Sequence, residues 1–192
     1  MADAPFLLER LGTLLHQSVR DAAARHRLQP IHIQVLQYLG RANHYSDLPI
    51  AVAEYFGITR GTVSQSLAVL ERRGLVAKQP DARHGRRIHF RLTEAGAGML
   101  RDSWARQLDE ALRSRPGADA IEEALRDVLV ALQRANGRRA FGICHECAHF
   151  RHGPGGTHCG LTGEPLAIEQ TTKICREWAA PATARAVPSG AR

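Results

Sequence analysis

The fold is decided by residues 52–93, which read VAEYFGITRGTVSQSLAVLERRGLVAKQPDARHGRRIHFRLT. The stretch predicts a short helix, a tight turn, and a second helix that Thr59 caps through its hydroxyl. In this second helix Val63, Leu67 and Leu70 recur at intervals of four and three residues, which marks one buried face. The opposite face is short and polar, so it can approach base edges in a major groove.

A basic hairpin is predicted directly after these two helices. Gly74 ends the second helix, residues 75–79 form one strand, and residues 88–92 alternate apolar and polar side chains in the other. Between residues 58 and 96 there are eight Lys or Arg against three Asp or Glu, so this segment supplies five of the seven net positive charges. A basic hairpin beside a polar helix face favours a nucleic-acid partner over an ordinary helical hairpin.

The run GTVSQSLAVLERRGLVAKQPDARHGRRIHFRLTEAG, residues 61–96, resembles the winged helix-turn-helix of the MarR family of bacterial transcription regulators. The positions that match the usual wing of that family are Asp81, Arg83, Gly85, Arg86, Arg87, Leu92 and Thr93. His84 stands where the family commonly has an acidic residue, which leaves a salt bridge at the wing tip without its acidic partner. The resemblance extends over roughly the first two thirds of the chain and does not include its end.

The resemblance implies a mainly α fold with a small β-hairpin wing, which dimerises through its N- and C-terminal helices. A small cysteine-rich module is added at the C-terminus. In such a fold we expect the recognition helix and the wing to bind DNA through Thr59, Arg60, Gly61, Thr62, Ser64, Gln65, Arg83, Arg86 and Arg87. A symmetric homodimer places two recognition helices about 34 Å apart, so the expected partner is double-stranded DNA with a palindromic operator.

The predicted organisation of the chain has five parts. They are an N-terminal dimerisation helix (1–30), the winged helix-turn-helix (31–96), C-terminal dimerisation helices (97–137), a four-cysteine module (138–178) and a disordered tail (179–192). The apolar stripe of the first helix, residues 6–27, suits either a dimer interface or an intramolecular core, and both interpretations stay open.

Further helices are predicted from their caps and apolar spacing. One begins at Pro30 and ends near Gly40, and a shorter one runs to Phe56 from a cap at Ser46 or Asp47. Another begins at a Thr93 cap, buries Met99, Leu100, Trp104 and Leu108, and breaks at residues 115–117. The last covers residues 119–136, with an apolar stripe of Ile121, Leu125, Val128, Leu129 and Leu132.

Every cysteine of the chain lies between residues 141 and 178. Cys144 and Cys147 form a Cys-x2-Cys pair, and Cys159 and Cys175 follow at longer intervals. Four thiolates returned to one centre suit either an iron–sulfur cluster or zinc, and the metal would supply folding energy that so short a segment lacks. Zinc ribbons generally have two Cys-x2-Cys pairs and this chain has one, which favours the iron–sulfur cluster.

The side chains near the cysteines leave several alternatives open. Aromatic residues expected to shield the centre from water are Phe141, Phe150 and Trp178. Histidines that either replace a cysteine ligand, donate hydrogen bonds behind the ligands or lie in solvent are His145, His149, His152 and His158. A thiol switch without metal is a further alternative.

Composition limits the function classes. The chain is 44% hydrophobic and 23% charged, as soluble globular proteins are, and its net charge of +7 favours an anionic partner. No signal peptide or membrane span is predicted, so we expect a cytoplasmic protein. The sequence has no thioredoxin-like pattern and no nucleotide loop, so we expect no enzyme.

The function predicted from these observations is a homodimeric, sequence-specific DNA-binding repressor that responds to metal or redox state through its four cysteines. Two alternatives remain beside it. One is a regulator that senses a small molecule and uses the cysteine module only as structure. The other is a thiol-redox or electron-transfer protein in which Cys144 and Cys147 exchange a disulfide.

Overall fold

The computed structural model describes residues 3–81, 85, 87–101, 103–137, 139–153 and 155–181. Its helices are α1 (Ala4–Arg25), α2 (Pro30–Arg41), α3 (Pro49–Phe56), α4 (Arg60–Arg72), α5 (Glu94–Gly98), α6 (Trp104–Arg113), α7 (Ala118–Ala135) and α8 (Ile168–Thr171), with a 3₁₀ turn η1 over Cys144–Glu146. Its strands are β1 (Val76–Pro80), β2 (Ile88–Leu92), β3 (Gly142–Ile143), β4 (Phe150–Gly153), β5 (Gly156–Cys159) and β6 (Ile174–Cys175). The antiparallel pairs in this part of the chain are β1–β2, β3–β6 and β4–β5. The predicted tail lies outside the described residues from position 182 onward.

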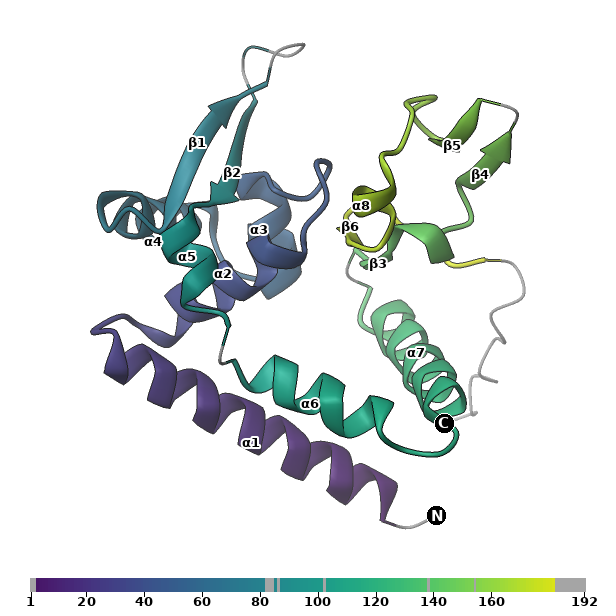
Figure 1. Cartoon of the computed structure of the whole chain (residues 1–192), viewed down its shortest axis with the longest axis horizontal. Helices are drawn as coiled ribbons and strands as arrows, with labels where there is room; N and C mark the ends of the chain where they lie inside the picture. The colour runs from purple at the N-terminus through teal and green to yellow at the C-terminus, as the bar shows by residue number, and fades with distance from the viewer. Residues whose placement is uncertain are drawn as a thin grey trace.

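The elements form two lobes above a set of long helices (Figure 1). One lobe contains α2 to α5 with the β1–β2 hairpin, and the other contains β3 to β6 with α8. Helices α1, α6 and α7 lie below both, and the hairpins β1–β2 and β4–β5 point to the same side of the molecule. Within the described ranges, no helix has the length and apolarity needed to cross a bilayer. The predicted fold class, mainly helical with a β-hairpin wing, is confirmed.

The helix-turn-helix forms as its sequence predicts. Gly57 ends α3 with a φ of 65°, a backbone conformation that glycine adopts without steric cost. The hydroxyl of Thr59 then accepts a hydrogen bond from the Thr62 amide at 3.2 Å, which caps α4. On the inner face of α4, Val63 and Leu70 have no exposed surface, and they pack against the core formed with α2, α3 and β2. Local capping and long-range packing therefore select the same boundary for this helix.

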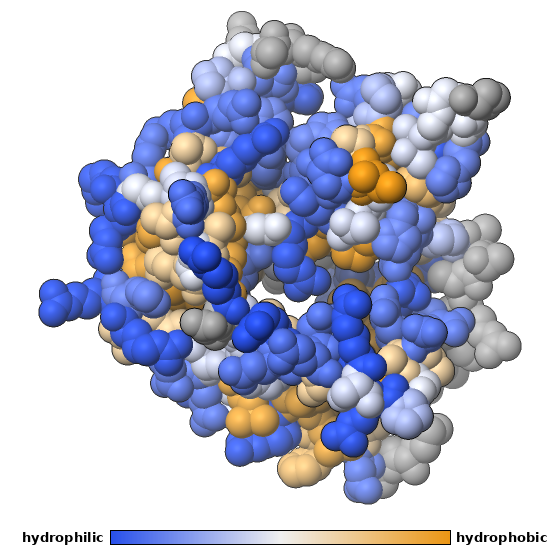
Figure 2. All heavy atoms as spheres, viewed as in Figure 1, coloured by the Kyte–Doolittle hydropathy of each residue, from blue (hydrophilic) through white to orange (hydrophobic). Residues whose placement is uncertain are grey.

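Helices α1 and α7 leave apolar side chains in solvent. In α1, Val19 and Ala23 pack against Ile33, whereas large apolar residues nearer the N-terminus are exposed, namely Phe6, Leu7, Leu8, Leu11 and Leu15. The predicted stripe of α7 is also exposed, with relative exposures from 37% for Ile121 to 56% for Leu132. Figure 2 shows apolar groups at the lower edge of the molecule, where α1 and α6 lie. The C-terminal half of α1 therefore packs in an intramolecular core, and a dimer interface stays a prediction for its exposed N-terminal half.

Two expectations about helices are wrong. Thr93 caps α5 as predicted, but α5 ends at Gly98, and the chain does not become helical again until Trp104. The glycines of α5 disfavour its extension, and Met99 and Leu100 in the interruption pack against the core only partly buried. The other two residues expected to be buried, Trp104 and Leu108, are also only partly buried.

The predicted cap of α3 is wrong as well. Its N-cap residue is Leu48, with no side-chain hydrogen bond. The two predicted candidates, Ser46 and Asp47, are buried instead and make hydrogen bonds with other parts of the chain. The α2–α3 loop, residues 42–47, therefore buries polar side chains inside the fold as well as connecting two helices.

Candidate functional site

The recognition helix presents the predicted DNA-binding side chains on one exposed face. Arg60, Gly61, Thr62, Ser64 and Gln65 of α4 are exposed, while the intervening Val63 is buried. The hydroxyls of Thr59 and Thr62 lie 2.9 Å apart at the start of the helix. Short polar side chains next to a helix N-terminus can donate and accept hydrogen bonds at base edges and phosphates.

The wing stands beside this helix as an antiparallel hairpin. Its register pairs Lys78 with Phe90, and Phe90 is the buried residue that anchors β2 in the core. The Lys78 ammonium lies 2.7 Å from the Glu71 carboxylate, which ties β1 to the end of α4. Arg87 is exposed directly before β2. Arg83 and Arg86, together with His84, lie outside the described residues.

A buried carboxylate holds the base of the wing. Asp47 of the α2–α3 loop accepts a hydrogen bond from the His89 ring, lies 3.8 Å from Arg91, and accepts the Phe90 amide at its carbonyl at 2.8 Å. Burial raises the pKa of Asp47, and the hydrogen bond with His89 opposes that rise. Sequence analysis missed this role because the partners are about forty residues apart in the chain.

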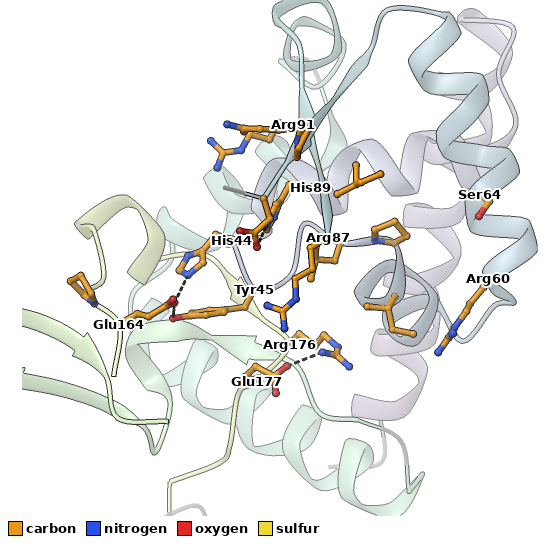
Figure 3. Close-up of a pocket in the computed structure, with 18 residues that line it drawn as sticks. His44, Tyr45, Arg60, Ser64, Arg87, His89, Arg91, Glu164, Arg176 and Glu177 are labelled. Atoms are coloured by element: carbon orange, nitrogen blue, oxygen red, sulfur yellow. Dashed lines mark hydrogen bonds and ion pairs between the residues drawn. The ribbon is translucent and has the colours of Figure 1, made fainter. Parts of the chain in front are cut away.

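A pocket of about 810 Å³ opens between the recognition helix, the wing and the cysteine module. Figure 3 shows Arg60 and Ser64 on one wall, Arg87 directed inward from the wing, and Arg176 directed into the same space from the C-terminal module. The basic side chains that line it are Arg60, Arg87, Arg91 and Arg176, and the acidic ones are Asp81, Glu164 and Glu177. The cysteine module therefore borders the candidate DNA-binding surface directly.

The four cysteines lie together in the second lobe. Cys144, Cys159 and Cys175 are buried in one cluster with Trp178, and Cys147 packs against it. The Cys147 sulfur accepts hydrogen bonds from the His149 amide at 3.4 Å and the Ala179 amide at 3.3 Å. None of the cysteines is in a disulfide. Within the described part of the chain, no three His, Cys, Asp or Glu side chains already form a group that could hold a metal ion.

Cys144 and Cys175 lie in the same buried cluster. A hydrogen bond with Cys144 lowers the pKa of Cys175, and the side chain of Asn43 acts in the same direction. The same hydrogen bond, together with burial, raises the pKa of Cys144. The two thiols therefore titrate as a pair.

Asn43 contributes an unsatisfied donor at this place. Its side chain has no exposed surface, and its amide nitrogen Nδ2 has no hydrogen-bond partner among the described residues. A buried N–H group without a partner costs about 1–3 kcal/mol. The Asn43 backbone amide donates to the Ile174 carbonyl at 3.0 Å, so the unsatisfied side chain belongs to a residue bonded to the strand that carries Cys175.

The aromatic residues near the cysteines divide between the lobes. Trp178 and Phe150 pack around the sulfurs as expected, and a side chain at Gly142 would overlap the Trp178 ring. Phe141, however, packs into the core of the first lobe, edge-on to Tyr38 and Tyr55. Its expected role as a shield of the cysteines is wrong, because the chain enters the module through the core of the first lobe.

The predicted histidines show no common role. His145 donates to the Thr171 carbonyl at 3.0 Å and lies 3.7 Å from Glu146, so its ring has partners away from the sulfurs. The ring of His152 packs on Phe150. His149 contributes its backbone amide to Cys147, a contact independent of its side chain.

An ion pair joins the two lobes. Arg176 donates to both carboxylate oxygens of Glu54, at 2.6 and 2.9 Å, and Arg139 approaches the same carboxylate at 3.2 Å. The hydrogen bond from Arg176 is the main cause of a lowered pKa at Glu54. Beside it, the Tyr45 hydroxyl donates to Glu164 at 2.7 Å and meets the Thr162 hydroxyl at 2.8 Å.

Comparisons with known proteins show what the first lobe is similar to. Residues 27–87 match the model of the MarR family. The structure is similar to CouR from Rhodococcus jostii RHA1 bound to p-coumaroyl-CoA, with a TM-score of 0.50 and 26% identity over 68% of this chain and 91% of CouR. It is also similar to a mutant of MepR from a multidrug-resistant clinical isolate of Staphylococcus aureus, with a TM-score of 0.54 and 20% identity over 68% of this chain and 96% of MepR.

Both alignments leave about a third of this chain uncovered. No curated protein matches the chain in sequence. The family match spans the two helices of the helix-turn-helix, the strand β1 and the start of the wing, which are the elements that carry the exposed polar face. The first lobe of this chain therefore has a winged helix-turn-helix fold, and its residues 27–87 are similar to the MarR family.

Proposed function

We propose that this chain is a homodimeric, sequence-specific DNA-binding transcription regulator that acts as a repressor at a palindromic operator. The observation that carries the proposal is the single exposed surface shared by the polar face of α4 and the arginines of the wing. The α4 side chains suit base edges in a major groove, and Arg60, Arg87 and Arg91 suit the flanking phosphates. We propose no catalytic activity.

Dimerisation through α1 and α7 is part of this proposal. Both helices expose apolar stripes that a folded monomer leaves without cover, and exposed stripes of this kind mark association surfaces. A two-fold axis between the stripes would present two recognition helices to successive major grooves of one duplex. A repressor of this kind would act by occupying its operator.

We further propose that Cys144, Cys147, Cys159 and Cys175 hold an iron–sulfur cluster or zinc. In support, four soft donors lie in one cluster, and Cys147 already accepts two backbone N–H groups, as a metal-bound thiolate does. The orphaned Asn43 amide offers a further donor beside the strand that carries Cys175. Because no group of three donors is in coordinating geometry within the described residues, binding requires the sulfurs to draw closer. A bound cluster would supply electron exchange, whereas zinc would supply a structural tie.

A thiol switch is the second candidate, and the pairing of Cys144 with Cys175 favours it. In this reaction the Cys175 thiolate attacks a peroxide, and Cys144 then closes an S–S bond with it. The two thiols lose two protons and two electrons, and hydrogen peroxide becomes two molecules of water. Cys144 and Cys175 lie in one cluster with Cys147 packed against it, so this pair stands beside the Cys144–Cys147 pair considered from the sequence.

A small-molecule effector with a purely structural cysteine module is the other alternative. CouR, a structural relative, is known bound to p-coumaroyl-CoA. If this chain senses an effector of that kind, the effector would change operator affinity without any change of state at the cysteines.

The test compares operator affinity in three samples: wild type loaded with metal, wild type stripped of metal, and Cys159→Ser. We expect the loaded protein to differ from the other two, which should agree with each other, because a ligand shifts an equilibrium only by differential binding. Equal affinities in all three would leave the cysteines a structural role. Peroxide treatment of wild type and of Cys144→Ser distinguishes the thiol switch from metal sensing. The thiol switch requires Cys144 and tolerates the loss of Cys159.

A further inference from the structure

The α2–α3 loop, residues 42–47, holds the strand that carries Cys175. The Asn43 amide donates to the Ile174 carbonyl at 3.0 Å, and the Arg176 amide donates to the Ser46 hydroxyl at 2.7 Å. Cys175 thus lies between two hydrogen bonds that join its strand to this loop. The Ser46 hydroxyl in turn donates to the Asn43 side chain at 2.9 Å, which closes the network within the loop.

The same loop holds the second strand of the wing. The Asp47 carbonyl accepts the Phe90 amide at 2.8 Å, and the Asp47 carboxylate contacts the His89 ring. Phe90 is buried in the lobe core, so the position of β2 depends on this contact as well as on its own packing. One short loop therefore contacts both the cysteine strand and the wing strand.

The loop is also well suited to transmit a small displacement. Asn43 and Ser46 have no exposed surface and Asp47 is 5% exposed, so their side chains cannot rearrange into solvent. The Tyr38 hydroxyl fixes the loop further by donating to the Ser46 carbonyl at 2.9 Å. Close-packed interiors transmit strain, and a buried hydrogen bond that is broken must be replaced nearby.

We propose that residues 42–47 couple the state of Cys175 to the wing through the two hydrogen bonds that join its strand to this loop. This inference rests on the proposed function, because it requires that the cysteines change state and that the wing binds DNA. Binding of a metal ion or a cluster requires the sulfurs to draw closer, which would move Cys175 and β6 with it. The Asn43 amide and the Ser46 hydroxyl, bonded to Ile174 and Arg176 on the two sides of Cys175, would carry that movement into the loop.

Some contacts between the lobes do not involve residues 42–47. The Arg176 side chain donates to both carboxylate oxygens of Glu54 on α3. Arg139 approaches the same carboxylate at 3.2 Å. A variant at Glu54 therefore provides a control that weakens the interface and leaves the hydrogen bonds of the loop intact.

The experiment measures Ser46→Ala against Glu54→Gln in the full chain. Each protein is prepared with Zn²⁺ alone, with ferrous iron and sulfide, and stripped by a chelator. Metal content and visible absorbance report occupancy. Affinity is measured on one duplex that the wild-type protein selects from a randomised pool. The quantity compared is the ratio of the Kd values of stripped and loaded protein.

We expect a wild-type ratio within the range of allosteric couplings, roughly 5- to 150-fold. Ser46→Ala should keep its metal and lose the dependence of affinity on metal, with a ratio close to one, and Glu54→Gln should keep the wild-type ratio. A wild-type ratio retained in loaded Ser46→Ala would overturn the coupling and leave the proposed function standing. A wild-type ratio of one would overturn sensing by the cysteines, and the coupling with it.

Amide hydrogen exchange of the wild type tests the same proposal without any substitution. Stripping the metal should accelerate exchange at the Asn43 amide and at the Phe90 amide, which the loop binds on its two sides. Amides within α4 that face away from the loop serve as the internal reference. Faster exchange at Asn43 with unchanged exchange at Phe90 would overturn the proposal, because the change would then stop within the loop.

Discussion

Single residues on the proposed DNA-binding surface are of two kinds. Gln65 and Thr62 are exposed on the outer face of α4, where side chains reach base edges. Arg87 directly before β2 and Arg60 at the start of α4 line the pocket beside that face, where they suit phosphates. Base contacts determine preference among sequences, whereas phosphate contacts determine affinity for all of them.

Substitution of Arg87 by Ala should therefore weaken binding to every duplex. We expect the dependence of log K on log salt to become shallower by about one unit, since one phosphate contact is lost. Gln65→Ala is the matched variant, and it should change the order of preference among sequences with little change in the salt slope. Titrations at several salt concentrations measure both quantities. An unchanged affinity and slope in Arg87→Ala would contradict the assignment of this hairpin as the wing.

The sequence predicts the roles of residues whose partners are close in the chain better than the roles of residues whose partners are distant in the chain. The cap at Thr59 and the buried Val63 follow from neighbours within one or two helical turns, and both predictions are confirmed. Ser46 and Asp47 do not cap a helix as predicted, because the groups that bind them, Arg176 and His89, come from distant segments of the chain. No spacing rule connects residues that only the folded chain brings together.

At the scale of elements, the same limit determines which features of the cysteine module the sequence could predict. Its four cysteines stand out in composition, and the structure places them in one cluster. The docking of β6 on the α2–α3 loop is not predictable from the sequence, nor is the packing of Phe141 into the first lobe, since short strands of two residues leave no periodic signal. α5 ends at Gly98, close to Gly96, and α6 begins only at Trp104. Both glycines have low helix propensity, a local signal against the single long helix predicted here.

The ion pair between Arg176 and α3 predicts a pH dependence of docking. The pKa of Glu54 is lowered in the folded chain, so its pairing with Arg176 stabilises the docked module fully above the ordinary carboxyl pKa of 4.5. This stability is lost as the pH falls below 4.5 toward the lowered value. Glu54→Gln should remove this part of the dependence. Proteolysis at the junction between the lobes, followed from about pH 6 to about pH 3, measures it; identical profiles for both proteins would contradict the docking role.

The cysteine module should fail as one unit if it holds a metal. Each of Cys144→Ser, Cys147→Ser, Cys159→Ser and Cys175→Ser should lose most of the bound metal, because three thiolates leave an incomplete shell. The first lobe has its own core, so its helical content should persist in all variants. Metal analysis and circular dichroism measure the two effects. Normal metal content in any single variant would remove that cysteine from the ligand set.

For the whole molecule, the exposed stripes on α1 and α7 predict a stable dimer. Leu129→Asp should produce monomers or insoluble protein, since a charge buried in an apolar interface without a partner is costly. Ala120→Asp is the matched control, because it introduces the same side chain on the exposed face of α7 that already carries Glu123 and Asp127. Sedimentation at micromolar concentration measures the mass. Equal masses for wild type and Leu129→Asp would place the interface elsewhere.

The two lobes give the molecule an arrangement suited to regulation. The winged helix and the cysteine module share the walls of one pocket and one buried loop, so a change at the sulfurs is close to the surface that would contact DNA. The long helices lie on the other side of the molecule (Figure 1), which leaves the wing free for a duplex when two copies associate. The proposed dimer contacts and the proposed DNA contacts therefore would not compete for the same surface.

The central claim is that two copies of this winged helix read one duplex, and a footprint on the DNA that the protein selects tests it most directly. We predict a sequence with two-fold symmetry, two chains per duplex, and two protected major-groove segments about 10 base pairs apart, one helical turn. Protection of a single segment by one chain, or no sequence selected above the background of the pool, would contradict the claim.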